Sequence, residues 1–138
     1  MRKIKKKNYN SWQSYYWDYQ KILAEDYYIP YLSNEGNILK LKKNSLSVID
    51  IGCGNGGFIS ALKESSEKRL KYQNVHASGI DIKTFKTWDT SQIDYKIHNI
   101  LNNENENYIE KHDLVILRDV LEHINIKNKK QFLEIASS

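Results

Sequence analysis

Short apolar runs separated by polar segments dominate the chain from residue 46 onward. The first of them, Leu-Ser-Val-Ile-Asp-Ile over 46–51, is rich in β-branched residues and ends at a cluster of glycines, as expected for a buried parallel strand. Further strands are predicted at 75–82, 94–100 and 113–117, and helices at 58–66, from about Asp119 and over 127–136. Strands that alternate with helical segments predict an α/β fold with a parallel sheet and right-handed crossovers.

Aromatic residues crowd the segment that precedes the first predicted strand. Four of them, Trp12, Tyr15, Tyr16 and Tyr19, follow the i, i+3, i+4, i+7 spacing of one helical face. The favoured interpretation is that this face packs the helix onto the domain. The alternative is a lid whose rings close over a ligand.

Composition adds the outline of the domains. The chain has 138 residues, of which 40% are hydrophobic and 28% charged, and these values are typical of a single globular domain. The net charge is +4, but five of the 21 Lys and Arg residues lie within the first seven positions and the rest are scattered, so a nucleic-acid partner is possible but not favoured. We expect a flexible basic arm (1–10), an aromatic-rich helical lid (11–45) and an α/β domain (46–138).

Cysteine count and hydropathy exclude several classes of protein. Cys53 is the only cysteine, so an internal disulfide and a cysteine-rich metal site are both excluded. The apolar runs are too short for a signal-peptide core or a membrane span. These observations predict a cytoplasmic protein without a membrane partner.

A cluster of glycines lies between the first predicted strand and the helix that follows it. Gly52, Gly54, Gly56 and Gly57 permit positive φ angles and a close approach of the backbone to a ligand. The helix N-terminus then presents unpaired N–H groups to that ligand. Because Gly52-x-Gly54-x-x-Gly57 also satisfies the dinucleotide pattern, the glycines alone leave NAD open as the ligand.

An acidic residue distinguishes this loop from a dinucleotide site. Asp50 lies two residues before the first glycine, and with it residues 48–58 resemble the first motif of class I S-adenosylmethionine-dependent methyltransferases. A carboxylate at the strand end can meet the cationic ammonium of that methyl donor, whereas it would be unfavourable beside the pyrophosphate of NAD. The alternative role for Asp50 is a cap on the glycine turn.

A second segment resembles the same superfamily. Residues 113–124, Asp-Leu-Val-Ile-Leu-Arg-Asp-Val-Leu-Glu-His-Ile, are similar to its fourth-strand motif, especially in the branch of ubiquinone-biosynthesis O-methyltransferases, where Leu-Glu-His commonly follows the strand. The resemblance covers roughly residues 46–132. It implies a Rossmann-like parallel sheet with flanking helices, S-adenosylmethionine as cofactor and methyl transfer to an O, N or C atom of a small-molecule acceptor.

The resemblance also assigns roles near the ends of the predicted strands. Asp81 suits the two ribose hydroxyls, because an ionised carboxylate offers only acceptors, and Ile82 would lie against the adenine. Asn99 stands where the family usually has an acid at the adenine edge, followed here by Ile100. The donor-binding residues implied in this way are Asp50, Gly52, Cys53, Gly54, Asn55, Gly56, Asp81, Ile82, Asn99, Ile100, Arg118 and Asp119.

His123 is the candidate catalytic residue. It could act as a general base on an acceptor hydroxyl, although a His that orients the local helix is the favoured interpretation, and Asp119 could simply cap that helix. Asp119-x-x-Glu122-His123 also resembles the metal signature of small-RNA 2′-O-methyltransferases. That family needs a further histidine, which does not follow, so no metal site is expected. An RNA 2′-O-methyltransferase-like enzyme, an NAD-binding domain and a non-catalytic binding module are the alternatives.

The number of predicted strands indicates a truncated domain. Only about four strands are predicted before residue 138, whereas the sheet of the family normally has seven. We therefore expect a donor-binding half that by itself binds S-adenosylmethionine weakly at best and lacks turnover. Its fourth strand would present an exposed apolar edge, which a second copy of the chain could cover in a homodimer.

Overall fold

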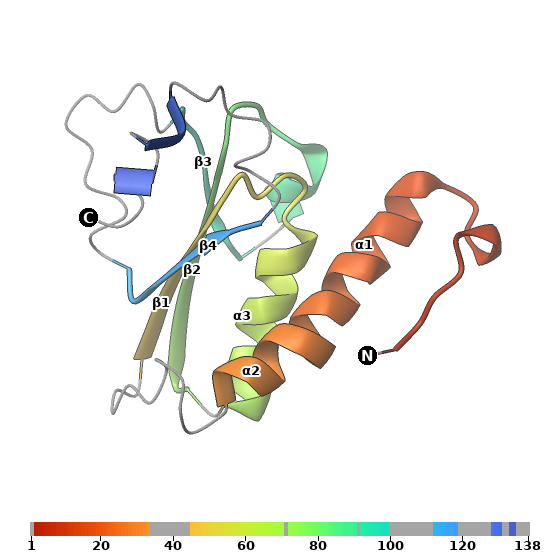
Figure 1. Cartoon of the computed structure of the whole chain (residues 1–138), viewed down its shortest axis with the longest axis horizontal. Helices are drawn as coiled ribbons and strands as arrows, with labels where there is room; N and C mark the ends of the chain where they lie inside the picture. The colour runs from red at the N-terminus through yellow and green to blue at the C-terminus, as the bar shows by residue number, and fades with distance from the viewer. Residues whose placement is uncertain are drawn as a thin grey trace.

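The structure, a computed structural model, describes residues 2–33, 45–70, 72–90, 92–99, 112–118, 128–130 and 133–134. Its centre is a four-stranded sheet of order β3-β2-β1-β4 (Figure 1). The strands are β1 Ser45–Ile51, β2 Asn74–Asp81, β3 Asp94–Ile97 and β4 Leu114–Leu117. All three neighbouring pairs are parallel. The predicted Rossmann-like parallel sheet with flanking helices is confirmed.

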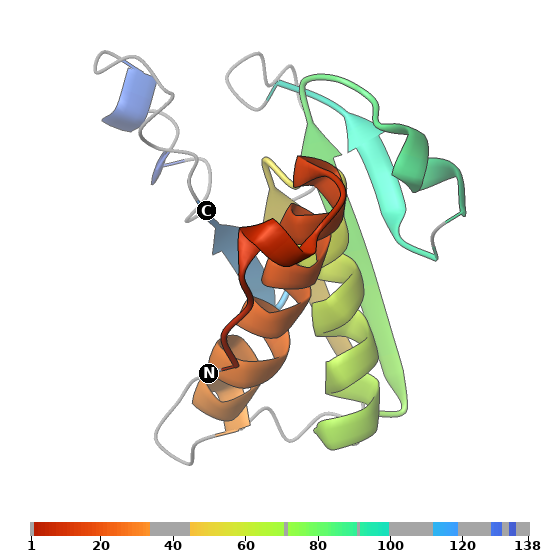
Figure 2. The ribbon, with the colours of Figure 1, turned by 90° about the vertical axis from the view of Figure 1, so that its right-hand side faces the viewer.

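Two helical units pack on one another next to this sheet. The helical elements are η1 Lys6–Asn8, α1 Trp12–Leu23, η2 Ala24–Tyr28, α2 Ile29–Ser33, α3 Gly57–Arg69 and η3 Lys86–Thr90. One unit is the segment from α1 through η2 to α2, and the other is α3. From α1 through η2 to α2 the backbone is one continuous rod that lies against α3, and α3 in turn packs on β2 (Figures 1 and 2). Among the described residues, no helix has both the length and the apolar character that a membrane span requires.

β1 is the centre of the hydrophobic core because it has a paired strand on each side. From Leu46 onward its residues are buried, with the exception of half-buried Ser47. α3 contributes Phe58, Ile59 and Leu62 to the same core. The nearly continuous apolar run of β1 is thus explained by burial on both faces, as in other parallel sheets.

The predicted boundaries hold closely for three strands and less well for two other elements. β3 ends at Ile97, and residue 100 lies outside the described part of the chain. α3 continues to Arg69, three residues past the predicted end at 66, because ion pairs one helical turn apart join Lys63 to Glu67 and Glu64 to Lys68. Within 127–136, residues 128–130 and 133–134 are helical, and the helix predicted from Asp119 lies outside the described residues.

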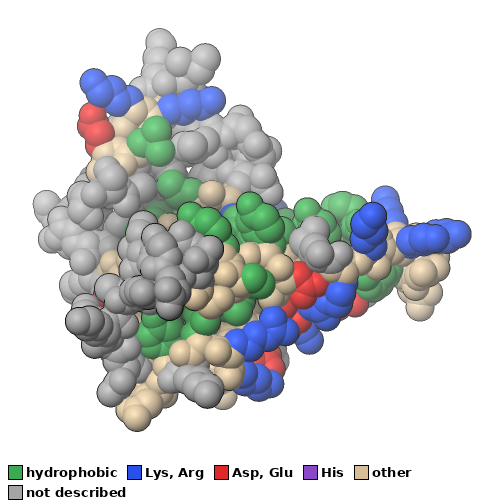
Figure 3. Space-filling model, turned by 60° about the horizontal axis from the view of Figure 1, so that its bottom comes forward, with side chains coloured by type: hydrophobic (Ala, Val, Ile, Leu, Met, Phe, Trp, Pro, Cys, Tyr) green, Lys and Arg blue, Asp and Glu red, His purple; other side chains and the backbone are tan. Residues whose placement is uncertain are grey.

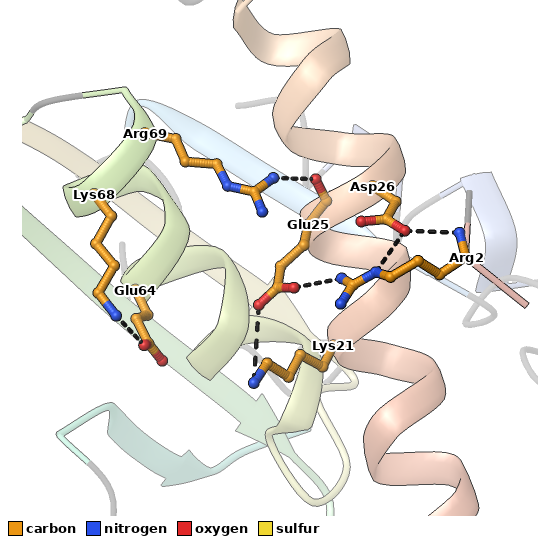
Figure 4. A network of polar contacts seen from close by, with 7 residues as sticks. All are labelled: Arg2, Lys21, Glu25, Asp26, Glu64, Lys68 and Arg69. Carbon is orange, nitrogen blue, oxygen red and sulfur yellow. Dashed lines mark hydrogen bonds and ion pairs between the residues drawn. The ribbon is translucent and has the colours of Figure 1, made fainter. Parts of the chain in front are cut away.

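The residues before α1 run back along the rod. Arg2 donates a hydrogen bond to Asp26 Oδ2 at 2.8 Å and forms an ion pair with Glu25 (Figure 4). The Arg2 guanidinium lowers the pKa of Asp26 to about 2. Arg69 of α3 donates to the Glu25 carbonyl oxygen at 2.9 Å, so the same segment of the rod also contacts α3. Residues 2–10, expected to form a flexible arm, are therefore held at one end by a polar contact.

Gly79 of β2 lies where two side chains approach the backbone closely. A Cβ atom at this position would lie 2.8 Å from Cys53 Sγ and 2.9 Å from the Tyr95 ring. Both neighbours belong to elements that are fixed by the sheet and by the loop after β1. We predict that Gly79→Ala lowers the free energy of unfolding by about 1–3 kcal/mol, because an overpacked core must shift to accept the methyl group.

Urea denaturation of Gly79→Ala and of the neighbouring variant Ser78→Ala measures this effect. Ser78 is half-buried and lies on the opposite face of the strand. Its truncation should change stability by less than about 0.5 kcal/mol. Equal stability of the two variants would contradict the close packing at Gly79.

Candidate functional site

The loop after β1 is pinned to the end of β2 by backbone hydrogen bonds. The N–H groups of Gly52 and Cys53 both donate to the Ile80 carbonyl oxygen, at 2.8 and 3.0 Å. The loop turns through three glycines with positive φ, at 74° for Gly52, 57° for Gly54 and 84° for Gly56. Such angles favour glycine, so the glycine cluster identified in the sequence is what allows the chain to turn from β1 into α3.

Asp81 fixes the same loop with its side chain. Its Oδ2 accepts from the Gly54 N–H at 2.8 Å, and its Oδ1 accepts from the Ile82 N–H at 2.7 Å. A carboxylate has about four lone-pair positions, so each oxygen retains one acceptor position for a ligand. Asp81 therefore has a structural task that the sequence did not predict, and it remains able to bind hydroxyl groups.

Two side chains of η3 hold the loop from its outer side. Thr87 Oγ1 donates to the Asn55 carbonyl oxygen at 2.7 Å, and Trp88 Nε1 donates to the Gly54 carbonyl oxygen at 2.8 Å. The Trp88 ring stacks on Tyr95 of β3, with 4.6 Å between centroids and 3° between planes. The sequence analysis missed these residues, and the one available signal was a tryptophan in an otherwise polar connector.

Asn55 and Gly56 form the start of α3. The Asn55 Oδ1 atom accepts from the Gly57 N–H at 3.0 Å, and Gly56 provides the left-handed residue before the helix. This capping contact satisfies one of the free N–H groups of the first helical turn. Asn55, predicted to bind a ligand, thus also orders the helix N-terminus that faces the loop.

Asp50 lies at the end of β1 with its side chain buried. It is 1% exposed, and its Oδ2 atom has no hydrogen-bond partner among the described residues. Burial raises the pKa of Asp50 to about 7, and nearby Asp81 acts in the same direction, while Arg118 opposes them. Gly52, Cys53 and Gly54 donate their N–H groups to other acceptors, so a capping role on this turn does not account for the buried acid.

Arg118 follows β4 directly and lies on the other side of Asp50 from β2. Its guanidinium carbon is 3.9 Å from the centroid of the Phe58 ring, a cation–π contact. Its Nε atom is buried without a hydrogen-bond partner in the described part of the chain. The site therefore holds one acidic and one basic side chain that are close enough to influence each other and are not joined in an ion pair among the described residues.

The structure places many of the predicted site residues around this loop. Asp50, the 52–56 loop, Asp81 and Arg118 meet at the carboxyl ends of β1, β2 and β4, which is where open α/β sheets bind ligands. Ile82 is 71% exposed beside Asp81. Asn99 is exposed two residues after β3. Ile100, Asp119 and His123 lie outside the described residues.

The loop after β1 also contains Cys53. Cys53 is buried, and burial raises the pKa of its thiol, which keeps the sulfur protonated. This favours a packing role over a nucleophilic one.

Within the described ranges, no group of three or more His, Cys, Asp and Glu side chains is arranged to hold a metal ion.

Comparison with known proteins gives one family and one fold. Residues 23–137 match a family described as "Methyltransferase domain". Magnesium protoporphyrin IX methyltransferase from Synechocystis PCC 6803, solved with bound SAM, superposes with a TM-score of 0.55 at 18% sequence identity. The superposition covers 86% of this chain and 53% of that protein, so the chain spans about half the length of this neighbour. A search of curated proteins found no match.

The pKa of Asp50 makes folding stability depend on pH. The folded protein retains this proton up to about pH 7, whereas an unperturbed Asp releases it near 3.8. Between these values the unfolded state binds fewer protons, so the free energy of unfolding falls as the pH rises. We predict that Asp50→Asn removes this decline in denaturation experiments between roughly pH 4 and pH 7.

Asp94→Asn is the matched control for this measurement. Asp94 is an exposed carboxylate at the start of β3, a strand that β2 separates from β1. Its variant should keep the pH slope of the unmodified protein. If Asp50→Asn and the unmodified protein show the same slope, Asp50 is ionised in the free protein at neutral pH and its raised pKa is refuted.

Proposed function

We propose that this chain, which belongs to the methyltransferase domain family, binds S-adenosylmethionine at the loop after β1 and takes part in methyl transfer to an O, N or C atom of a small-molecule acceptor. The observation that carries the proposal is the buried Asp50 carboxyl beside a glycine loop, whose Oδ2 atom has no hydrogen-bond partner among the described residues. A neighbour of the same fold was solved with bound SAM, which supports the same choice of ligand.

The charge of the ligand follows from the environment of Asp50. Desolvation of the buried carboxylate is unfavourable and outweighs the opposing charge of Arg118, so the pKa in the free protein is near 7. The ammonium group of S-adenosylmethionine would stabilise the ionised carboxylate and offset the free-energy cost of its desolvation. The pyrophosphate of NAD would add negative charge beside Asp50 and Asp81, which the site disfavours.

The other donor-binding roles in this proposal belong to residues at or after the carboxyl ends of the strands. Asp81 keeps an acceptor position on each oxygen for the ribose hydroxyls, and exposed Ile82 offers an apolar surface to one face of the adenine. Asn99 can both accept from and donate to the adenine edge through its amide. Ile100, Arg118 and Asp119 complete the donor site in this proposal.

The chain contributes positioning more than activation to the reaction. The bound donor supplies an activated methyl group on its sulfonium. The loop, clamped by Asp81 and Trp88, holds a fixed backbone against the donor, and this favours the in-line geometry that methyl transfer requires. We assign His123 the role of general base toward an acceptor hydroxyl, and residues 11–45 the role of a helical lid beside this site.

Calorimetric titration with S-adenosylhomocysteine and with NAD tests the proposal. We expect heat of binding with the first compound only, and an affinity that rises between roughly pH 6 and pH 7.5, because the ammonium group requires Asp50 to be ionised. Asp50→Asn should weaken binding by about tenfold or more, since the ligand's charge loses its partner.

Asp94→Asn serves here too as the control, because it removes one exposed carboxylate on β3, which β2 separates from β1. Its affinity should equal that of the unmodified chain. Binding of NAD in preference to S-adenosylhomocysteine would overturn the choice of ligand. Unchanged affinity in Asp50→Asn would overturn the role of this residue while leaving the ligand in place.

A further inference from the structure

A continuous row of aromatic rings lies along the first half of α1. Its members, which we call the aromatic row, are Tyr9, Trp12, Tyr15, Tyr16 and Tyr19. Neighbouring ring centroids are 5.5–6.5 Å apart throughout. Trp12 is 54% exposed and Tyr19 38% exposed, while the other three rings are half-buried, so the row presents apolar surface to solvent mainly at Trp12 and Tyr19.

The aromatic row is not the face through which α1 packs on α3. At their contact, Trp17 and Gln20 lie against Gly57, where an added Cβ would be 3.1 Å from Trp17 and 2.5 Å from the Gln20 side chain. Gln20 is buried, in contrast to Trp12 and Tyr19. The sequence interpretation that the aromatic face packs the helix onto the domain is therefore wrong for this contact, because the small Gly57 admits the neighbouring face instead.

Four lysines precede the aromatic row in the segment that leads to α1. They are Lys3, Lys5, Lys6 and Lys7, and no described carboxylate lies within ion-pair distance of any of them. Arg2 is tied to Asp26, which keeps this segment alongside the rod. The Lys6 Nζ atom lies 4.9 Å from the centroid of the Trp12 ring. Figure 3 shows apolar side chains along the projecting rod, with Lys and Arg side chains at its far end and again, among Asp and Glu, along its lower edge.

We propose that the aromatic row and these four lysines form a docking surface for an anionic lipid bilayer. Trp and Tyr rings are amphipathic and favour the headgroup level of a membrane. Lysines beside them are attracted to anionic headgroups, and their apolar stems can lie along the rings. The lysines come directly before the aromatic row in the chain, and Lys6 lies over the Trp12 ring, so charge and aromatic surface are combined as interfacial binding requires. No spanning helix is needed for such docking.

The arrangement of the rings favours lipid over single-stranded nucleic acid. Proteins that bind single strands stack the bases on free aromatic faces. Here Trp12 stacks on Tyr16 with 14° between planes, and Tyr19 stacks on Tyr15 and Tyr16 with 21° and 18°. These faces are already directed at one another. Asp18, the one acid of α1, has its Oδ2 engaged by the Tyr9 hydroxyl at 2.9 Å.

Cosedimentation of the full chain with lipid vesicles tests this proposal. We expect binding to vesicles of phosphatidylcholine mixed with phosphatidylglycerol, little binding to phosphatidylcholine alone, and release by salt. Replacing the four lysines by Lys3→Gln, Lys5→Gln, Lys6→Gln and Lys7→Gln should weaken binding by about tenfold or more. Trp12→Ser should weaken it with the charge unchanged.

A second lysine variant controls for net charge. Lys83→Gln, Lys86→Gln, Lys96→Gln and Lys130→Gln remove the same charge away from α1 and should bind vesicles as the unmodified chain does. Circular dichroism of each variant checks that it is folded. Equal loss in both lysine variants, vesicle binding that survives all these changes, or binding to a single-stranded oligonucleotide without binding to vesicles would each overturn the proposal. None of these outcomes depends on donor binding.

Discussion

The burial of one carboxyl group, that of Asp50, is the constraint around which the site is built. Asp50 is the residue before the last of β1, the strand with a partner on each side, and it is 1% exposed. Water is therefore excluded from a group that water normally keeps ionised. The free protein responds with a raised pKa, and a cationic ligand would replace the proton.

The loop around Asp50 is rigid because several independent contacts fix it. Asp81 and the Ile80 carbonyl hold it from the end of β2, Asn55 caps α3, and Trp88 holds the Gly54 carbonyl from outside. A preorganised backbone of this kind loses little entropy when a ligand binds. In a reaction where the donor already carries an activated methyl group, such positioning is the main contribution left to the protein.

Local sequence patterns predicted the sheet and the glycine loop, but they could not predict contacts between residues that are far apart in the sequence. The apolar run of β1 and the glycines after it predict a buried strand and a turn with positive φ, and both are present. The hydrogen bond from Trp88 to the Gly54 carbonyl oxygen joins residues 34 positions apart, and no spacing rule connects them. The helical spacing from Trp12 to Tyr19 identified one face correctly, but spacing cannot say whether a face is covered, and Gly57 decided that α1 packs through another.

The most direct measurement of the central claim is a pH titration of the Asp50 side-chain carboxyl by carbon-13 NMR, with and without S-adenosylhomocysteine. In the free protein this carboxyl should titrate near pH 7. With the ligand bound it should remain ionised to a clearly lower pH, because the ammonium group stabilises the carboxylate. A carboxyl that is already ionised in the free protein at roughly pH 5, or whose pKa is unchanged by the ligand, would contradict the account.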